Sequence, residues 1–138
     1  MSETRIHPVT HARLTRDSRP FVVRYRDLER TVDLPGWYPA KRGGESLHVG
    51  DDMAVADAAL AELKAESQGV LKPAEVRAIR LRLKLSQRKA SELLGGGPRA
   101  FQKYESGEVL VSRSMTQLLR LLERDPRRLE ELKQPSAA

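Results

Sequence analysis

The stretch LSQRKASELLGGGPRAFQKYESG, residues 85–107, decides the fold of half of this chain. Ser86 is a good N-cap residue, because its side-chain oxygen can accept a hydrogen bond from a free N–H group at the start of a helix. The glycines at 95–97 then end that helix. Pro98 suits the first position of a second helix, since proline has a fixed φ and no N–H group to lose. Two short helices joined by a glycine turn predict a helix-turn-helix unit.

The second helix is predicted to have an apolar and a polar face. Ala100, Phe101 and Tyr104 recur at helical spacing and should face inward. The opposite face carries hydrogen-bond donors and no carboxylate, namely Arg99, Gln102, Lys103 and Ser106. Arg and Lys can donate to guanine O6 and N7, and Gln can pair with adenine, so this set suits the major groove of duplex DNA. The alternative is a solvated polar face on a small helical bundle.

Three segments carry a family resemblance: LSQRKASELLGGG, FQKYESGE and SRSMTQLLRLLERDP. Together they resemble the Cro/repressor-type (XRE) helix-turn-helix domain, and the triple glycine followed by AFxxYExG is similar to the MqsA family of bacterial antitoxins. The resemblance spans residues 70–133. It implies that Gln87 lies near the DNA backbone beside Ser86 and Arg88, and that Arg99 and Lys103 reach bases. The family typically has Asn and Arg at those two positions, so its operator sequence does not carry over.

Length and composition favour a compact regulator. A chain of 138 residues holds one ordinary domain or two small ones. It has no run of eighteen apolar residues and no apolar segment like that of a secretion signal, so we expect a soluble cytoplasmic protein. The absence of cysteine excludes disulfides, Cys-ligated zinc and a thiol nucleophile. We predict no enzymatic activity, because the sequence lacks a G-x-S-x-G elbow, a phosphate loop and a His-Glu-x-x-His motif.

The net charge of +6 is unevenly spread. Residues 71–138 hold 15 Lys and Arg against 8 Asp and Glu, hence +7, whereas residues 1–70 hold 10 against 11, hence −1. The basic half is the half with the helix-turn-helix pattern, where contacts to phosphate would hold the register of the reading helix. The candidates for such contacts are Arg77, Arg80, Arg82, Lys84, Arg88 and Lys89.

Residues 70–133 are predicted to form an all-α domain of five helices. A first helix runs from Leu71 to about Leu83, with Val76, Ile79 and Leu83 inward. After a loop at 108–111, Ser112 caps a fourth helix. The predicted core positions of this fourth helix are Met115, Leu118, Leu119 and Leu122.

The end of the chain leaves two alternatives open. A short final helix begins at Asp125-Pro126. Leu121, Leu129 and Leu132 fit the core face poorly, so they could close the core or form a dimer seam. We favour a homodimer through this domain, because repressor-type domains read symmetric operators with two recognition helices about one DNA turn apart. Residues 134–138 are expected to be a disordered tail.

Residues 1–69 have a different, β-rich character, so the predicted class of the whole chain is α+β. Residues 21–25 alternate as a strand, and residues 30–34 return as its partner across an Asp27-Leu28 turn. Pro35-Gly36 is expected to end this hairpin. The short strands that follow would hold Trp37, Tyr38, Leu47 and Val49. A helix from Asp51 to Glu66 would bury Val55, Ala58, Ala59 and Leu63, and residues 66–69 would form a hinge to the second domain.

In the MqsA family, this part of the chain is normally held by zinc bound through two Cys-x-x-Cys pairs. Here His7 and His11 stand near the first pair, and Pro39 and Arg42 stand where the second would lie. A structural zinc ion takes four ligands, so we predict that the protein binds no metal or other cofactor. We interpret all three histidines, including His48, as surface residues. The sheet would then depend on Phe21, Val23, Tyr25, Trp37 and Tyr38.

The resemblance implies an antitoxin that represses its own operon and neutralises a toxin through residues 1–69, most simply an mRNA endonuclease of the MqsR kind. An RNA-cleaving toxin tends to be basic, and an acidic run could meet it. That run is Glu45, Asp51, Asp52, Asp57, Glu62 and Glu66. The alternative is a stand-alone XRE-type regulator whose first domain senses a ligand or only assists assembly.

Overall fold

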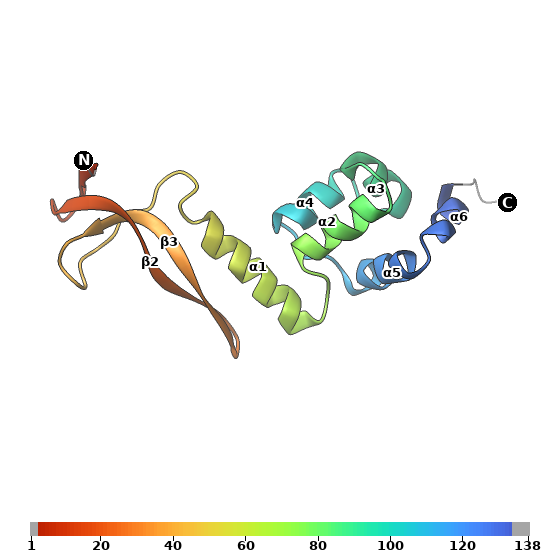
Figure 1. The fold of residues 1–138 in the computed structure, drawn as a ribbon, viewed down its shortest axis with the longest axis horizontal. Coiled ribbons are helices and arrows are strands. Elements are labelled where there is room, and N and C mark those ends of the chain that lie inside the picture. The colour runs from red at the N-terminus through yellow and green to blue at the C-terminus, as the bar shows by residue number, and fades with distance from the viewer. Residues whose placement is uncertain (1–2, 134–138) are drawn as a thin grey trace. The chain divides into compact units, whose positions relative to one another are not determined.

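The structure, a computed structural model, describes residues 3–133. An antiparallel sheet in the order β1-β2-β3 comes first, and helices follow (Figure 1). The strands are β1 (Thr4–Ile6), β2 (Arg13–Tyr25) and β3 (Leu28–Pro39). The helices are α1 (Ala54–Gln68), α2 (Pro73–Arg82), α3 (Gln87–Leu94), α4 (Ala100–Ser106), α5 (Arg113–Arg124), the 3-10 turn η1 (Pro126–Arg128) and α6 (Leu129–Lys133). The predicted α+β class is confirmed. The chain divides into two compact units after Leu60, within α1.

The β2–β3 hairpin is much longer than predicted. Its register runs from Leu14 opposite Pro39 to Tyr25 opposite Leu28, so the chain reverses at 26–27, one residue earlier than expected. Pro35 and Gly36 do not end the hairpin, because both lie inside β3. Glycine at position 36 leaves room for the His48 side chain, because an ideal Cβ there would lie 2.5 Å from Nδ1 of His48.

The other strands also differ from the prediction. Strand β1 was not predicted, and it pairs with residues 13–15 of β2. Trp37 belongs to β3 rather than to a separate strand. The predicted strand around Leu47 is reduced to one bridge, in which Trp37 and Leu47 exchange two backbone hydrogen bonds of 2.8 Å.

The first unit, residues 3–60, has a thin apolar core supplemented by cationic side chains. The buried apolar residues are Leu14, Val23, Leu34, Trp37, Tyr38, Ala56 and Ala59. Phe21 was predicted to belong to this core but is 41% exposed, because so small a unit has few side chains to cover it. The guanidinium carbons of Arg5 and Arg16 lie 4.8 and 5.6 Å from the centre of the Trp37 ring, within the range of cation–π attraction.

An ion pair closes this unit. Asp52, predicted as part of an acidic surface, is buried and accepts hydrogen bonds from Nη1 of Arg16 (2.9 Å) and from the backbone N–H of Val49 (2.9 Å). The Arg16 bond is the main reason that the pKa of Asp52 falls to about 2. Asp52 is therefore removed from the acidic run.

Helix α1 buries a different face from the one predicted. Ala56, Ala59 and Leu63 are buried, whereas Val55 and Ala58 are exposed, so only Ala59 and Leu63 of the predicted set face inward. An alanine-rich helix has a weak apolar period, which explains the error. The helix also continues through residues 66–68, and only Gly69 (φ 70°) leaves it.

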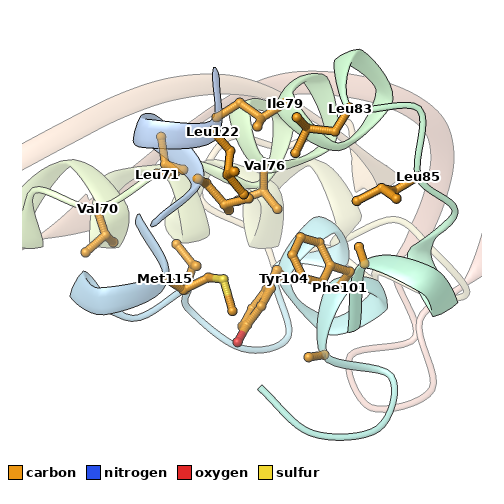
Figure 2. Packing of buried hydrophobic residues seen from close by; sticks show 14 of the residues in the cluster. Val70, Leu71, Val76, Ile79, Leu83, Leu85, Phe101, Tyr104, Met115 and Leu122 are labelled. Atoms are coloured by element: carbon orange, nitrogen blue, oxygen red, sulfur yellow. The ribbon is translucent and has the colours of Figure 1, made fainter. Parts of the chain in front are cut away.

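The second unit, residues 61–133, is an all-α bundle around one cluster of sixteen buried apolar residues. Figure 2 shows Val76 and Ile79 of α2, Phe101 of α4 and Met115 of α5 in this cluster. The residues predicted to face inward from α2 and α4 are all buried. Of those predicted for α5, Met115, Leu119 and Leu122 are buried and Leu118 is half-buried against the cluster. Leu129 also joins the core.

Candidate nucleic-acid interface

The two helices of the motif begin and end largely as the sequence predicts. Ser86 Oγ accepts a hydrogen bond from the backbone N–H of Lys89 at 3.0 Å, which confirms its capping role. The glycines at 95–97 all have positive φ. Pro98 is not the first residue of α4, however, because the turn continues through Arg99, the N-cap residue, which has left-handed backbone angles (φ 62°, ψ 19°).

Two contacts that the sequence did not predict fix α3 against α4. The Ser91 hydroxyl donates to the carbonyl of Gln87 (3.0 Å) and accepts from the backbone N–H of Phe101 (3.2 Å). At Gly96 an ideal Cβ would lie 2.5 Å from Oη of Tyr104, so the turn passes close to the hydroxyl end of that side chain. The angle between the two helices is therefore held by a side-chain hydrogen bond and by one close contact.

A buried ion pair joins α2 to α4. The guanidinium of Arg80 donates to both carboxylate oxygens of Glu105, at 2.7 and 2.9 Å, and to the carbonyl of Leu85 at 2.8 Å. Its bond to Glu105 raises the pKa of Arg80. Arg80 is therefore not one of the phosphate contacts that we predicted. The spacing of Arg80 from Val76 and Leu83, which places it on the inward stripe of its helix, was the signal for this role.

Four of the side chains predicted to contact DNA, at the bases or at the backbone, are gathered on one surface. Arg99 and Gln102 are exposed, and Gln87 and Lys103 are half-buried. Two adjoining hollows, of about 540 and 790 Å³, share the side chains of Gln87, Arg99 and Gln102 in their walls. Nε of Arg99 donates to Oε1 of Gln102 at 2.7 Å. Within residues 3–133, no carboxylate forms an ion pair with Arg99 or Lys103, so their charges face solvent.

The residues at the start of α3 flank this surface. Ser86 and Arg88 are exposed, and Arg88 Nε lies 3.3 Å from a carboxylate oxygen of Glu92 one turn further along. An exposed pair of this kind contributes little to stability, so phosphate could replace the carboxylate at small cost. Arg82 is paired in the same way with Glu123 at 3.2 Å.

The residues at the expected zinc position do not fit a metal ion. His7 is only 5% exposed, which corrects its prediction as a surface residue. Its Nδ1 accepts the backbone N–H groups of Val9 and Thr10, both at 3.1 Å, and so lacks a free lone pair for a metal. Its Nε2 lies 3.5 Å from Oε2 of Glu45. In the described part of the chain, no three His, Cys, Asp or Glu side chains gather in a way that could hold a metal ion.

The other two histidines differ from each other. His11 is exposed, as predicted. His48 is half-buried, with Nδ1 2.9 Å from the carbonyl of Pro35 and Nε2 3.0 Å from the Ser46 hydroxyl. Its ring also meets that of Tyr38 edge-on, with centroids 5.6 Å apart. His48 is thus a structural residue that ties residues 46–48 to β3.

The chain thus combines a small antiparallel sheet with a bundle of short helices. The chain belongs to the MqsA antitoxin family: the model of that family, described as the antitoxin component of a bacterial toxin-antitoxin system, matches residues 5–133. The chain is 37% identical over 81 residues to Antitoxin MqsA of Escherichia coli (strain K12), a match that covers 56% of this chain and 62% of that relative. The resemblance inferred from the sequence is confirmed. Among the helices described, none is long and apolar enough to cross a membrane.

Proposed function

We propose that this antitoxin represses its own operon by binding a symmetric operator through α3 and α4, and neutralises a cognate toxin through residues 1–69. The observation that carries the DNA-binding part is the surface of Gln87, Arg99, Gln102 and Lys103. These side chains present donors toward solvent. Of the carboxylates that line the same hollows, Glu105 is bound to Arg80 and Glu92 is paired with Arg88, whereas Glu108 lies at the edge of the second hollow. A surface rich in donors and cations suits guanine edges and phosphates.

A symmetric operator requires a dimer. Leu121 and Leu132 are 61% and 42% exposed, and with Leu118 they line a hollow of about 180 Å³. Arg128 and Glu131 lie at the same hollow and pair with each other at 3.2 Å. An apolar centre with a polar rim is typical of protein interfaces, so these leucines are the proposed dimer seam. Leu121→Glu should convert the dimer to a monomer in analytical ultracentrifugation.

The DNA-binding proposal is tested by gel-shift titration of a palindromic fragment from the promoter of the protein's own operon, at fixed salt. The double variant Arg99→Ala/Lys103→Ala should lose most specific binding. Arg13→Ala/Arg24→Ala removes the same charge from exposed positions on the β2 strand and is the matched control. Equal binding by wild type and the Arg99/Lys103 variant would refute the assignment of this surface.

The toxin-binding part is supported by the open edge of the sheet. Because Trp37 exchanges both backbone hydrogen bonds with Leu47, its polar groups point away from β2, and so do those of every second residue along β3. Pro35 in this series offers only its carbonyl, which His48 occupies. Glu29, Thr31 and Asp33 therefore present three successive N–H and C=O pairs, to which a partner strand can add.

The opposite edge of the hairpin, formed by β2, is less suitable for a partner strand. Beyond residues 13–15, no strand of the described chain covers the outer edge of β2. Its outward series includes Pro20, which has no N–H group, and Ser18, whose N–H is bound to the Asp17 carboxylate at 2.8 Å. The β3 edge is therefore favoured over the edge of residues 21–25.

One cross-strand pair allows a matched test, because Val22 lies opposite Thr31 and each directs its N–H group outward. Thr31→Pro removes one donor from the β3 edge, and Val22→Pro removes one from the β2 edge, at positions of the type that Pro20 and Pro35 already occupy. In cells that express the adjacent toxin gene, Thr31→Pro should fail to relieve growth arrest, whereas Val22→Pro and Arg99→Ala/Lys103→Ala should relieve it.

Other outcomes of this experiment decide against parts of the proposal. Loss of relief with Val22→Pro alone would move the interface to the β2 edge. If even the wild-type chain gives no relief, the alternative of a stand-alone regulator is favoured. The proposed toxin is basic and RNA-cleaving, of the MqsR kind, and exposed Glu45, Asp51 and Asp57 remain available to meet it.

A further inference from the structure

The hydrogen bond between Arg99 and Gln102 determines what each of them can do at a base. Arg99 carries donors only, so the Gln102 atom that faces its Nε must be the amide oxygen, 2.7 Å away. The amide NH2 group of Gln102 then points away from Arg99. The two residues are three positions apart, across the first turn of α4, where side chains are neighbours.

This bond leaves the outer edge of the guanidinium free. With Nε engaged, the two Nη groups remain as a pair of parallel donors. Guanine offers two acceptors at matching spacing in the major groove, O6 and N7, whereas adenine offers N7 beside a donor, its N6 amino group. A fixed pair of donors therefore selects guanine over adenine.

The backbone of Arg99 is fixed as well as its side chain. Arg99 is the N-cap residue in the left-handed region, and its carbonyl accepts the N–H of Lys103 at 3.1 Å. An exposed arginine normally loses much rotamer freedom when it docks. Here the bond to Gln102 removes part of that freedom before DNA binds. Docking then costs less conformational entropy, which raises affinity.

No carboxylate of residues 3–133 forms an ion pair with Arg99. The acidic side chain nearest along α4, Glu105, is held by Arg80 in a two-point contact. A neutral amide therefore orients Arg99 without cancelling the positive charge that attracts DNA.

From these contacts we propose that Arg99 reads one guanine in each half-site through its two Nη groups, and that Gln102 positions Arg99 rather than reading a base of its own. This inference rests on the proposed DNA-binding function. It changes the sequence-based expectation that Gln102 pairs with adenine. The two roles for Gln102 differ in one measurable respect, namely which base pair depends on it.

The test measures binding of the full chain to a set of operator duplexes in which each half-site base pair is replaced in turn. The wild-type protein should prefer guanine at one position per half-site by roughly ten- to a hundredfold. Arg99→Ala should abolish that preference. Gln102→Ala should weaken it at the same position, leave the preferences at other positions unchanged, and have no further effect when combined with Arg99→Ala.

Two further variants distinguish loss of the Arg99–Gln102 hydrogen bond from a general loss of DNA affinity. Gln102→Glu retains an acceptor for Nε, so it should keep the guanine preference while lowering affinity for all duplexes, since it adds a negative charge near phosphate. Arg88→Ala should weaken all duplexes alike, as expected for a phosphate contact. Unchanged melting temperatures of these surface variants would exclude misfolding.

The opposing outcomes separate this inference from the function on which it rests. If Gln102→Ala relaxes a different base pair, or if its effect adds to that of Arg99→Ala, Gln102 reads its own base and the inference fails while DNA binding stands. If the wild-type protein shows no preference among the duplexes, the proposed operator binding fails, and the inference fails with it.

Discussion

Residues 61–133 bury a cluster of sixteen apolar side chains around Phe101, whereas residues 3–60 bury seven, two of them alanines. The first unit compensates with arginines that lie against its aromatic rings and with the ion pair between exposed Arg16 and buried Asp52. The second unit also has an ion pair, Arg80–Glu105, with both side chains buried, but its apolar cluster is already continuous. The comparison teaches that a helical bundle of this size is stabilised mainly by packing, while the small sheet depends on charged side chains.

The two phenylalanines of the chain test this contrast directly, because Phe101 is 0% exposed and Phe21 is 41% exposed. Phe101→Ala should lower the free energy of unfolding of the second unit by about 4 kcal/mol, and Phe21→Ala should cost less than about 1 kcal/mol. Urea denaturation followed by helical circular dichroism reports the second unit. Fluorescence of Trp37, the only tryptophan, reports the first. Equal losses for the two variants would break the comparison.

Breaking the Arg80–Glu105 pair should destabilise the second unit strongly, whereas replacing both residues with apolar ones should destabilise it little. Glu105→Leu leaves the Arg80 guanidinium buried without its partner, which should cost about 3 kcal/mol. The double variant Arg80→Met/Glu105→Leu should recover most of that loss, since neither charge then remains. Denaturation of the single and double variants measures both effects. A double variant as unstable as the single one would show that the pair itself stabilises the bundle.

The sequence predicted the second unit well because its local signals agree with one another. Ser86 and Ser112 cap helices as expected, and the apolar period of α2 and α5 gives the core. The Arg80–Glu105 contact was missed because no local rule pairs residues 25 positions apart. The candidate site was assembled from predicted residues, but the bond between Arg99 and Gln102 requires the side-chain geometry of the turn.

The first unit was predicted less well because its signals conflict. Pro35-Gly36 is a strong turn signal, yet β3 runs through it, since the hairpin edge tolerates proline and His48 needs the space at Gly36. The role of Asp52 could not be predicted, because its partner Arg16 is distant in the sequence and lies on a strand that was not expected to begin so early.

Two glycines extend the comparison, because at each an ideal Cβ would lie 2.5 Å from an aromatic side chain: from Nδ1 of His48 at Gly36 and from Oη of Tyr104 at Gly96. Gly96→Ala should cost about 2 kcal/mol, since φ is +97° and the atom it meets belongs to Tyr104 in the core cluster. Gly36→Ala should cost about 1 kcal/mol or less, because half-buried His48 can move aside. Thermal melts of both variants check the order. A larger loss for Gly36→Ala would mean that the first unit is the more rigidly packed one.

Acid should weaken the first unit through Asp52. Its pKa is lowered in the folded chain to about 2, so the stability it provides is present above the unfolded value near pH 4 and is lost as the pH falls toward 2. The pKa of Asp17 is lowered as well, chiefly by Arg19, and adds to the same window. Trp37 fluorescence in urea, measured between pH 5 and 2, should show this loss. Asp52→Asn should be less stable at pH 6 and should flatten the curve. An unchanged curve would argue against the pair.

The last and smallest expected effect is that of a metal chelator, which should leave the stability of the first unit unchanged. His7 accepts two backbone N–H groups, and Pro39 and Arg42 offer no ligand atoms, so the first unit should fold without zinc. Protein purified without a histidine tag should contain less than about a tenth of a zinc ion per chain, and chelator should leave the melting temperature unchanged. His7→Ala supplies the control: it removes an acceptor for two N–H groups and should cost about 1–3 kcal/mol equally with and without chelator. If chelator lowers the wild-type melting temperature and abolishes the difference from His7→Ala, then His7 binds a metal, and the contrast between an ion-pair-stabilised sheet and a packed bundle is wrong for the sheet.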